Sequence, residues 1–517
     1  MRLARLVRPA FLPAKKFLSR LHRKPKLTLL VIVLYIVIRS LFWLAIDYLW
    51  HPKELHLALL NAHYFQQGTE LPTADYRKHS VIVLFFANQR LHAQSLPFQC
   101  PVLGTNNWIM YGLAGIEVIS GAADGGNIVE EDDSCPILLY RMRCTLATVH
   151  LYTAFMKIGT LPGVEIPVHQ TSKWERRVVI CLNPVRAYDN WRQMMTLLES
   201  ARAQHVERVN VYADSMTKPL RELLSAYEDE KYVRVNATIR FDHYNVKEFN
   251  QHSDWMSLVA SNNDCLYYYK YVTQFVVFMD VADMFFSAES WWERDFQYLQ
   301  SMRRYTAAYI INLRKAAIRY ENNPLDSLKS IQVSTQPSTR LPIRVAASND
   351  VYCVLPRKIT FDAHEKIPHI NQITDKFQAK QLVVPPEHGY GLDVSENYEF
   401  GGFERSFEEV YPNFNWDHLN ELFGHFMEKT NVSAIVEKQP RFLNRQYGDA
   451  NKCLRSAHDR SYDGGKCRAT KECKNVISVE PCYQTRMKMK YRGFNLRMGL
   501  HYYTELELVK IPSRYCV

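Results

Sequence analysis

The sequence predicts an α/β protein built around a doubly wound, mostly parallel sheet. From Trp174 onward, short apolar segments alternate with segments whose apolar residues recur every three or four positions. One apolar segment, Phe275–Met279, has no polar residue at all, which is typical of a strand that helices cover on both faces. Alternating strands and helices predict a parallel sheet, and ligands of such sheets bind at the carboxyl ends of the strands.

Local patterns assign the elements of this sheet. Residues Trp191–Leu198 carry an apolar stripe with the i, i+3, i+4, i+7 spacing of a helix, and Asp189 or Asn190 is placed to cap it. Pro219 is placed to open the next helix. The expected elements are, in order, a strand over Arg177–Leu182, a helix around Trp191–Leu198, a strand over Val209–Ala213, a helix around Leu220–Tyr227, a strand over Tyr232–Phe241, a helix around Asp254–Tyr267 and a strand over Phe275–Met279.

The positive charge of the chain is concentrated at its beginning. The net charge is +11, yet nine basic residues and no acidic residue fall within residues 1–26, which leaves +2 for the rest of the chain. A folded body this close to neutral has no net-charge reason to bind a phosphate backbone. We therefore interpret residues 1–26 as a basic cytoplasmic tail and expect no nucleic acid among the partners.

An apolar segment of twenty residues follows that tail. Leu27–Ile46 contains Arg39 as its only charged residue and would span about 30 Å as a helix, the thickness of a bilayer core. A cleaved signal peptide is the alternative, but the charged lead is long for one and no clear small-residue cleavage site follows. A signal anchor predicts one helix in the lipid bilayer, a single-pass type II membrane protein and a lumenal body in the Golgi or the ER, because basic residues favour the cytoplasmic side.

Three further regions flank the predicted sheet. Residues 47–79 are expected to form a stem, and residues 80–172, with short apolar runs broken by Gly, Asn and Asp clusters, a small β-rich unit. Residues 431–517 contain five of the eleven cysteines, and no pair has CxxC spacing, which favours disulfides over zinc. Two sequons predict glycosylation at Asn236 and Asn431. Because Asn236 falls within a predicted strand, Asn431 is the stronger candidate.

Two carboxylates follow the wholly apolar strand. Asp280 and Asp283 come directly after Phe275–Met279, at the edge where a doubly wound sheet binds its ligand. Carboxylate oxygens suit a hard divalent cation, Mn2+ or Mg2+, which would neutralise the charge that grows on a leaving phosphate. The alternative is that both residues only cap the turn after the strand.

Several segments around this acid pair resemble glycosyltransferase family 92, in the same order. The segment most similar to the family is NNDCLYYYKYVTQFVVFMDVADMFF (Asn262–Phe286), an Asn-Asp-Cys-Leu element followed by a hydrophobic strand that ends in acids. The resemblance extends over residues 174–390, and we expect the catalytic domain to occupy 174–430. The other similar segments are CLNP (Cys181–Pro184), HVERVNVYADS (His205–Ser215), LRELLSAYEDEKYVRV (Leu220–Val235) and LPRKITFDAHEKIPHI (Leu355–Ile370).

This resemblance implies a GT-A-like fold and transfer of a hexose, with galactose as the expected sugar, from a UDP-sugar to a glycan acceptor. It also implies inversion at the sugar carbon and assistance by Mn2+. Asp280 would bind the cofactor, and Asp280 and Asp283 would bind the metal, with His388 as a candidate third ligand from a segment similar to the family's late His-Tyr-Arg. Where the family usually carries a middle acid, this chain has Ala282.

Inverting transfer needs a carboxylate base to take the proton of the acceptor hydroxyl. Glu387 and Asp393 are the first candidates, and Glu396 and Glu399 lie nearby in the sequence. The alternative from a different class is a non-catalytic lumenal protein that keeps the fold and acts in glycan binding or assembly, which Ala282 favours. A metal-dependent phosphohydrolase ranks third, because only the acid pair supports it.

Overall fold

The computed structural model describes most of the α/β part of the chain and selected strands elsewhere. The described residues are 33–40, 55–65, 79–88, 98–104, 109–118, 137–146, 151–158, 164–170, 176–238, 253–269, 272–302, 306–340, 342–347, 380–394, 405–411, 413–430, 476–477, 482–495, 498–511 and 515–516.

The chain divides into two compact units, Met1–Glu54 with Asn495–Arg497 and the remainder. In the first unit, residues 33–40 form a short helix whose large apolar side chains are between 45% and 63% exposed. No helix within the described ranges combines the length and the apolar character that a membrane crossing requires. The other residues of the predicted anchor over 27–46 lie outside the described part of the chain.

Seven strands near the beginning of the second unit close into a ring. Their order is β1-β2-β5-β4-β3-β6-β7, and β7 pairs in turn with β1. Leu57, Ala58 and Ala62 of β1 are fully buried, so this part of the expected stem over 47–79 is a core strand. The ring strands are β1 (Leu55–Phe65), β2 (His79–Asn88), β3 (Phe98–Gly104), β4 (Ile109–Val118), β5 (Ile137–Leu146), β6 (Leu151–Ile158) and β7 (Val164–Gln170).

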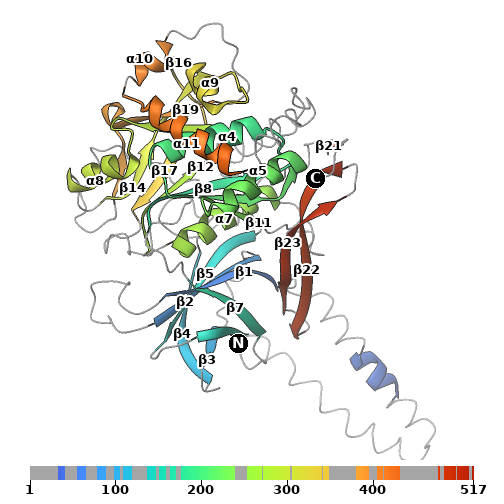
Figure 1. Cartoon of the computed structure of the whole chain (residues 1–517). Helices are drawn as coiled ribbons and strands as arrows, with labels where there is room; N and C mark the ends of the chain where they lie inside the picture. Colours follow the sequence, from blue (N-terminus) through green and yellow to red (C-terminus); the bar gives the residue numbers. More distant parts are fainter. Residues whose placement is uncertain are drawn as a thin grey trace, which may run out of the picture. The chain divides into compact units, whose positions relative to one another are not determined.

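A seven-stranded mixed sheet forms the centre of the α/β part (Figure 1). Its first four strands, β11, β9, β8 and β12, are parallel neighbours, and β17 runs antiparallel between β12 and β14. The mixed α/β fold that the sequence predicts is therefore confirmed. In spatial order the strands are β11 (Val233–Ala237), β9 (Arg208–Ala213), β8 (Arg176–Val185), β12 (Thr273–Met279), β17 (Ile343–Ala347), β14 (Thr306–Ile311) and β18 (Lys380–Val383).

Helices cover both faces of this sheet. Ile180 of β8 packs in a core cluster with residues of α4, α5, α8 and α11, whereas its neighbour Cys181 packs in a second cluster with residues of α7. Adjacent residues of a strand point to opposite faces, so the two clusters lie on the two sides of β8. The helices are α4 (Trp191–Ala203), which Asn190 caps, α5 (Lys218–Asp229), α7 (Ser253–Tyr269), α8 (Trp292–Met302) and α11 (Trp416–Lys429).

The strands of a smaller five-stranded sheet alternate along the chain with the later strands of the central sheet, and two of them contain Asp283 and Asp393. Gly389 has φ +148°, and a Cβ atom there would lie 2.6 Å from the Phe285 ring, so this β13–β19 pairing requires glycine. The strand order is β13 (Asp283–Ser287), β19 (Gly389–Asp393), β15 (Leu313–Ala317), β16 (Gln332–Pro337) and β20 (Arg405–Ser406).

Two long strands near the C-terminus, β22 (Cys482–Asn495) and β23 (Met498–Ile511), extend the sheet of the ring (Figure 1). β23 pairs with β1, and β22 pairs with β10 (Ser215–Thr217), which directly follows β9 and Asp214. The predicted Cys-rich region over 431–517 therefore contributes strands to the sheet that the N-terminal strands begin.

A disulfide joins Cys181 of β8 to Cys265 of α7, with a Cα–Cα distance of 6.2 Å. Disulfide bonding is therefore confirmed, although this bridge lies in the α/β part and not in the C-terminal region. Cys482 of β22 is also disulfide-bonded. The Cys181–Cys265 bridge closes a separation of 84 residues and holds α7 against the second face of the central sheet.

The carboxylate of Asp264, one residue before that bridge, connects three elements. It accepts hydrogen bonds from Asn61 Nδ2 at 2.6 Å and from the Tyr212 hydroxyl at 2.7 Å, and its Oδ1 lies 2.9 Å from His63 Nε2. Burial raises the pKa of Asp264, but the hydrogen bonds and charge of its partners outweigh this effect and lower that pKa to about 2. Asp264 therefore ties α7 to β1 and β9 as an ionised carboxylate.

We expect protonation of Asp264 to lower the free energy of unfolding in acid. Its folded pKa of about 2 lies below the usual value near 3.9, so its contribution, about 2 kcal/mol, is present above about pH 4 and is lost as the pH falls toward 2. Urea unfolding from pH 6 to pH 2 should show this loss in the wild type. The Asp264→Asn variant should be less stable at pH 6 and should lose less stability on acidification. Parallel curves for the two proteins would contradict the prediction.

Candidate functional site

The acid pair predicted from the sequence forms the turn between β12 and β13. Asp280 Oδ1 accepts a hydrogen bond from the Ala282 backbone N–H at 3.0 Å, and Asp283 Oδ2 accepts one from the Asp280 N–H at 2.8 Å. The Asp283 N–H also donates to the Asp280 carbonyl at 3.0 Å. Both carboxylates therefore cap the turn in which they lie, and this turn stands at the carboxyl end of a parallel strand.

A third carboxylate joins this pair through the β13–β19 pairing. Asp393 ends β19 and lies directly opposite Asp283 in the antiparallel register. The Asp393 side chain is fully buried and that of Asp283 is 4% exposed, whereas that of Asp280 is 17% exposed. The Val394 N–H donates to the Ala282 carbonyl at 2.9 Å, so the end of β19 is fixed directly to the acidic turn.

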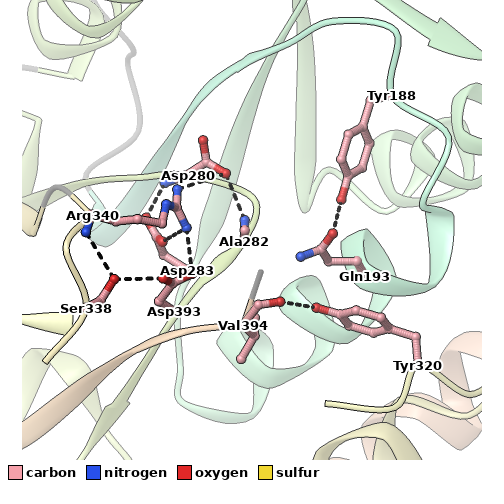
Figure 2. A network of polar contacts seen from close by, with 10 residues as sticks. All are labelled: Tyr188, Gln193, Asp280, Ala282, Asp283, Tyr320, Ser338, Arg340, Asp393 and Val394. Atoms are coloured by element: carbon pink, nitrogen blue, oxygen red, sulfur yellow. Dashed lines mark hydrogen bonds and ion pairs between the residues drawn. The ribbon is translucent and has the colours of Figure 1, made fainter. Parts of the chain in front are cut away.

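The guanidinium of Arg340 points into the group of three carboxylates (Figure 2). Its Nη1 lies 2.7 Å from Asp283 Oδ1 and 3.0 Å from Asp393 Oδ1, and its Nη2 lies 3.5 Å from Asp280 Oδ1. Arg340 comes from the loop between β16 and β17. In that loop the Ser338 hydroxyl donates to Asp393 Oδ2 at 2.7 Å and accepts from the Arg340 N–H at 3.0 Å. We call Asp280, Asp283, Asp393, Ser338 and Arg340 the acidic cluster.

Burial and neighbouring charges together shift the pKa values of Asp283 and Arg340. Burial, together with the charges of Asp280 and Asp393, raises the pKa of Asp283 to about 7, against the lowering effect of Arg340. Burial lowers the pKa of Arg340, but the three carboxylates outweigh burial and raise it above its ordinary value. With all carboxylates ionised, the four charged residues of the cluster together carry three negative charges and one positive charge.

The carboxyl ends of the neighbouring strands carry further polar side chains. Met279 of β12 pairs with Leu182 of β8, which pairs with Val211 of β9, so the three strands end close together. After β8, Arg186 Nε lies 3.3 Å from Oδ2 of Asp214, which follows β9. These charged groups share an edge of the sheet with Asp280, where parallel sheets bind ligands.

Two tyrosines make hydrogen bonds in the same region (Figure 2). The Tyr188 hydroxyl donates to Gln193 Oε1 at 2.5 Å, and the Tyr320 hydroxyl donates to the Val394 carbonyl at 3.1 Å. The second bond holds the chain at the point where it leaves β19. Tyr320 is thus connected through Val394 to the acidic turn, whereas the Tyr188 bond holds the end of β8 against the first turn of α4.

The structure brings Asp280, Asp283 and Asp393 together but separates them from His388 and Glu387. These two residues belong to a short 3-10 helix, Pro386–His388, that precedes Gly389, and Gly389 pairs with Ser287 at the other end of the β13–β19 ladder. At about 3.4 Å per residue, five residues of strand separate His388 from Asp393 by about 17 Å. Because β19 is extended, His388 does not lie beside Asp280 and Asp283 in this structure, and its role as a metal ligand stays a prediction.

One of the two predicted sequons, at Asn236, lies in a part of the chain that the structure describes. Asn236 is half-buried within β11, where it pairs with Tyr212, and Thr238 of its sequon is 1% exposed. A glycan is poorly accommodated there, in line with the preference for Asn431. Asn431, Glu396 and Glu399 lie outside the described residues.

The acidic cluster as it lies does not fit a divalent cation. Within the described ranges, no group of three or more His, Cys, Asp or Glu residues has a metal-binding arrangement. Oxygen ligands lie about 2.0–2.6 Å from Mg2+ or Ca2+, and the Arg340 guanidinium already fills the space between Asp283 and Asp393. Arg340 and Ser338 could not be predicted from the sequence, because their loop carries no recognisable motif. The only available signal was that buried carboxylates require a counter-charge.

We expect Ser338→Ala to lower the free energy of unfolding by about 1.5–3 kcal/mol, because the fully buried Asp393 loses a hydroxyl donor. Urea unfolding measures this change. The neighbouring Thr339 is exposed, and Thr339→Ala should change stability by less than about 0.5 kcal/mol. An equal effect of both substitutions would contradict the role assigned to Ser338.

Comparison with known proteins finds a similarity that covers the central sheet together with Asp280, Asp283 and Arg340. Residues 176–390 match the profile of glycosyltransferase family 92. Two family 92 proteins of Caenorhabditis elegans are each 26% identical to the chain, one over 226 residues (40% of this chain, 44% of the relative) and one over 113 residues (21% and 22%). The chain thus matches less than half the length of these curated relatives.

Among solved structures, TarS residues 1–349 of S. aureus in complex with UDP-GlcNAc is 10% identical, covers 62% of this chain and 97% of its own, and has a TM-score of 0.24. The same TarS fragment without that ligand gives a TM-score of 0.23 at 11% identity, with 66% of this chain and 99% of its own covered. Scores this low carry no argument about the fold or the ligand. The sequence match is the informative one: the chain carries a glycosyltransferase family 92 domain over residues 176–390.

Proposed function

We propose that the protein is a glycosyltransferase with a GT-A-like fold that moves a hexose, galactose being the expected sugar, from a UDP-sugar to a glycan acceptor with inversion. The family 92 domain is the observation that carries this proposal. It is supported by the position of Asp280, at the carboxyl end of the central parallel strands and more exposed than the other two carboxylates.

The polar groups at this edge of the sheet suit a nucleotide-sugar. The Arg186 side chain is 25% exposed and offers a positive charge for an anionic group, and Asp280 can accept hydrogen bonds from hydroxyl groups of a ribose or a sugar. Tyr188 lies just beyond the end of β8, in contact with Gln193. The donor would therefore lie across the ends of β8, β9 and β12.

In the proposed reaction the acceptor hydroxyl oxygen attacks the anomeric carbon of the donor. The bond from that carbon to the diphosphate oxygen breaks, and its electron pair leaves with UDP. The hydroxyl proton passes to a carboxylate base. Asp393 is fully buried and bound to Arg340 and Ser338, and Glu387 lies at the far end of the β13–β19 ladder. Neither candidate contacts an acceptor position in this arrangement, so we assign the base to neither.

The resemblance to family 92 also implies Mn2+ at this site. The carboxylates that would hold the ion are engaged by Arg340, by Ser338 and by backbone N–H groups of the acidic turn. We therefore derive no step of the transfer through a metal ion.

A second candidate function is a non-catalytic glycosyltransferase-like protein that acts in glycan binding or assembly. Two observations favour it. Ala282 occupies the middle of the acidic turn with a fully buried methyl side chain, and Arg340 pairs with the carboxylates on either side of it in the chain. A protein of this kind would keep the fold and the polar network and would not turn over a donor.

The experiment that separates the two functions incubates the full-length protein in detergent with a panel of UDP-sugars and measures free UDP, with and without EDTA. We expect hydrolysis of one donor, and Asp280→Asn should reduce it by about 100-fold or more. Asp229→Asn, at an exposed carboxylate at the end of α5, is the matched control and should retain activity. Full turnover by Asp280→Asn would reject the site, and no turnover of any donor by the folded wild type would favour the second function.

We also propose that the protein is a single-pass type II membrane protein of the Golgi or the ER with a lumenal catalytic part. The basic residues 1–26 before the apolar residues 27–46 support this topology, and the Cys181–Cys265 disulfide is typical of oxidising compartments.

In sealed microsomes, added protease should remove an N-terminal epitope and spare a C-terminal one. Detergent should expose both epitopes, and the reverse protection pattern would contradict the proposed topology.

A further inference from the structure

The role of Arg340 follows from where its guanidinium lies. It contacts all three carboxylates of the acidic cluster, at 2.7 Å, 3.0 Å and 3.5 Å, and its side chain is only 14% exposed. A buried guanidinium needs counter-charges, and buried carboxylates need a cation. Arg340 and the three aspartates therefore satisfy one another within the folded chain.

The position of Arg340 excludes a second cation from the same place. A divalent ion shared by Asp283 and Asp393 would need an oxygen of each within about 2.0–2.6 Å. The Arg340 Nη1 atom lies between those same two oxygens, and the other oxygens of both carboxylates accept from the Asp280 N–H and the Ser338 hydroxyl. To bind there, a metal ion would have to displace the guanidinium.

The chain also fixes Arg340 in this position from the side of its own loop. The Ser338 N–H donates to the Leu313 carbonyl of β15 at 2.8 Å, and the Ser338 hydroxyl accepts from the Arg340 N–H at 3.0 Å. The same hydroxyl donates to Asp393. Ser338 therefore holds both Arg340 and one of its carboxylate partners, so the guanidinium is placed by the fold and not only by attraction.

The residual negative charge of the cluster lies closest to solvent at Asp280. This residue has the longest contact with Arg340, 3.5 Å, and the largest exposure of the three carboxylates. An anionic carboxylate attracts uncharged hydroxyl donors and repels phosphate oxygens. Asp280 therefore suits the hydroxyl groups of a donor better than its diphosphate.

We propose that Arg340 is the resident cation of this site: it takes the place of a divalent metal ion between Asp280, Asp283 and Asp393, and the folded cluster does not bind Mn2+ or Mg2+. This inference deepens the proposed glycosyltransferase function by assigning the counter-charge of its acidic site to a side chain. Its test measures metal binding and not turnover, so the two proposals can fail separately.

The test measures thermal unfolding of the full-length protein with increasing Mn2+, in the absence and presence of UDP. Mn2+ should not stabilise the wild type, or Arg340→Lys, which keeps the positive charge, by binding at Asp280. Both should therefore respond to Mn2+ as Asp280→Asn does. The double variant Arg340→Met/Asp393→Asn loses one charge of each sign and leaves Asp280 and Asp283 to face a metal ion. It should bind Mn2+ at least about tenfold more tightly than the wild type, because a nearby positive charge has gone.

Two results would overturn the proposal. One is stabilisation of the wild type by Mn2+, with or without UDP, that disappears in Asp280→Asn. The other is a folded double variant that gains no affinity for Mn2+. If the double variant does not fold, Mn2+ is titrated into the wild type and into Asp280→Asn, and binding is followed by electron paramagnetic resonance. Equal binding curves support the proposal. Weaker Mn2+ binding by Asp280→Asn rejects it. If Mn2+ does not stabilise the wild type and the wild type turns over no donor, the resident-cation proposal is supported and the glycosyltransferase proposal is rejected.

Discussion

A buried guanidinium between three carboxylates determines how the acidic end of this protein is arranged. Arg340 connects the turn after β12, the end of β19 and the loop between β16 and β17, three segments that are distant in the sequence. Removing one partner from a buried ion pair typically costs about 3–5 kcal/mol, because the other charge is left uncompensated. The positions of Asp280 and Asp393 therefore depend on each other through a residue that lies between them in the chain.

The central sheet fixes the position of the acidic turn. Parallel strands β8, β9 and β12 end close together, and their apolar residues are buried against helices on both faces. The Cys181–Cys265 disulfide and the bonds to Asp264 fix α7 to this sheet and to β1 of the ring. The ring strands thus help to hold the helix that leads into β12, and β12 carries the acidic turn. The C-terminal strand β22 pairs with β10, just after Asp214, so both ends of the second unit contribute to the frame of the site.

The sequence predicted the site in part, and the missing part has a physical explanation. Asp280 and Asp283 follow a wholly apolar strand, and an apolar strand in an α/β pattern places its last residues at the ligand edge. Asp393 could be named only as one of several acids, because antiparallel pairing with Asp283 is a tertiary property. The distance of His388 from the acidic turn could not be predicted either, because the sequence does not show that the five residues after it are extended. The local pattern around Arg340 contains nothing that distinguishes it from a solvated surface arginine.

The sequence by itself determined the mixed α/β fold, most of the strands and helices of the central sheet, the acidic turn and the family of the domain. Each of these depends on short-range patterns: apolar periodicity, helix caps and the order of a few motifs. The tertiary structure decided that β1 is a core strand, that the C-terminal strands join the same sheet, and that Arg340 occupies the space between the carboxylates. These features depend on pairing between distant segments and on the need of each buried charge for a partner, and neither is encoded in the spacing of neighbouring residues.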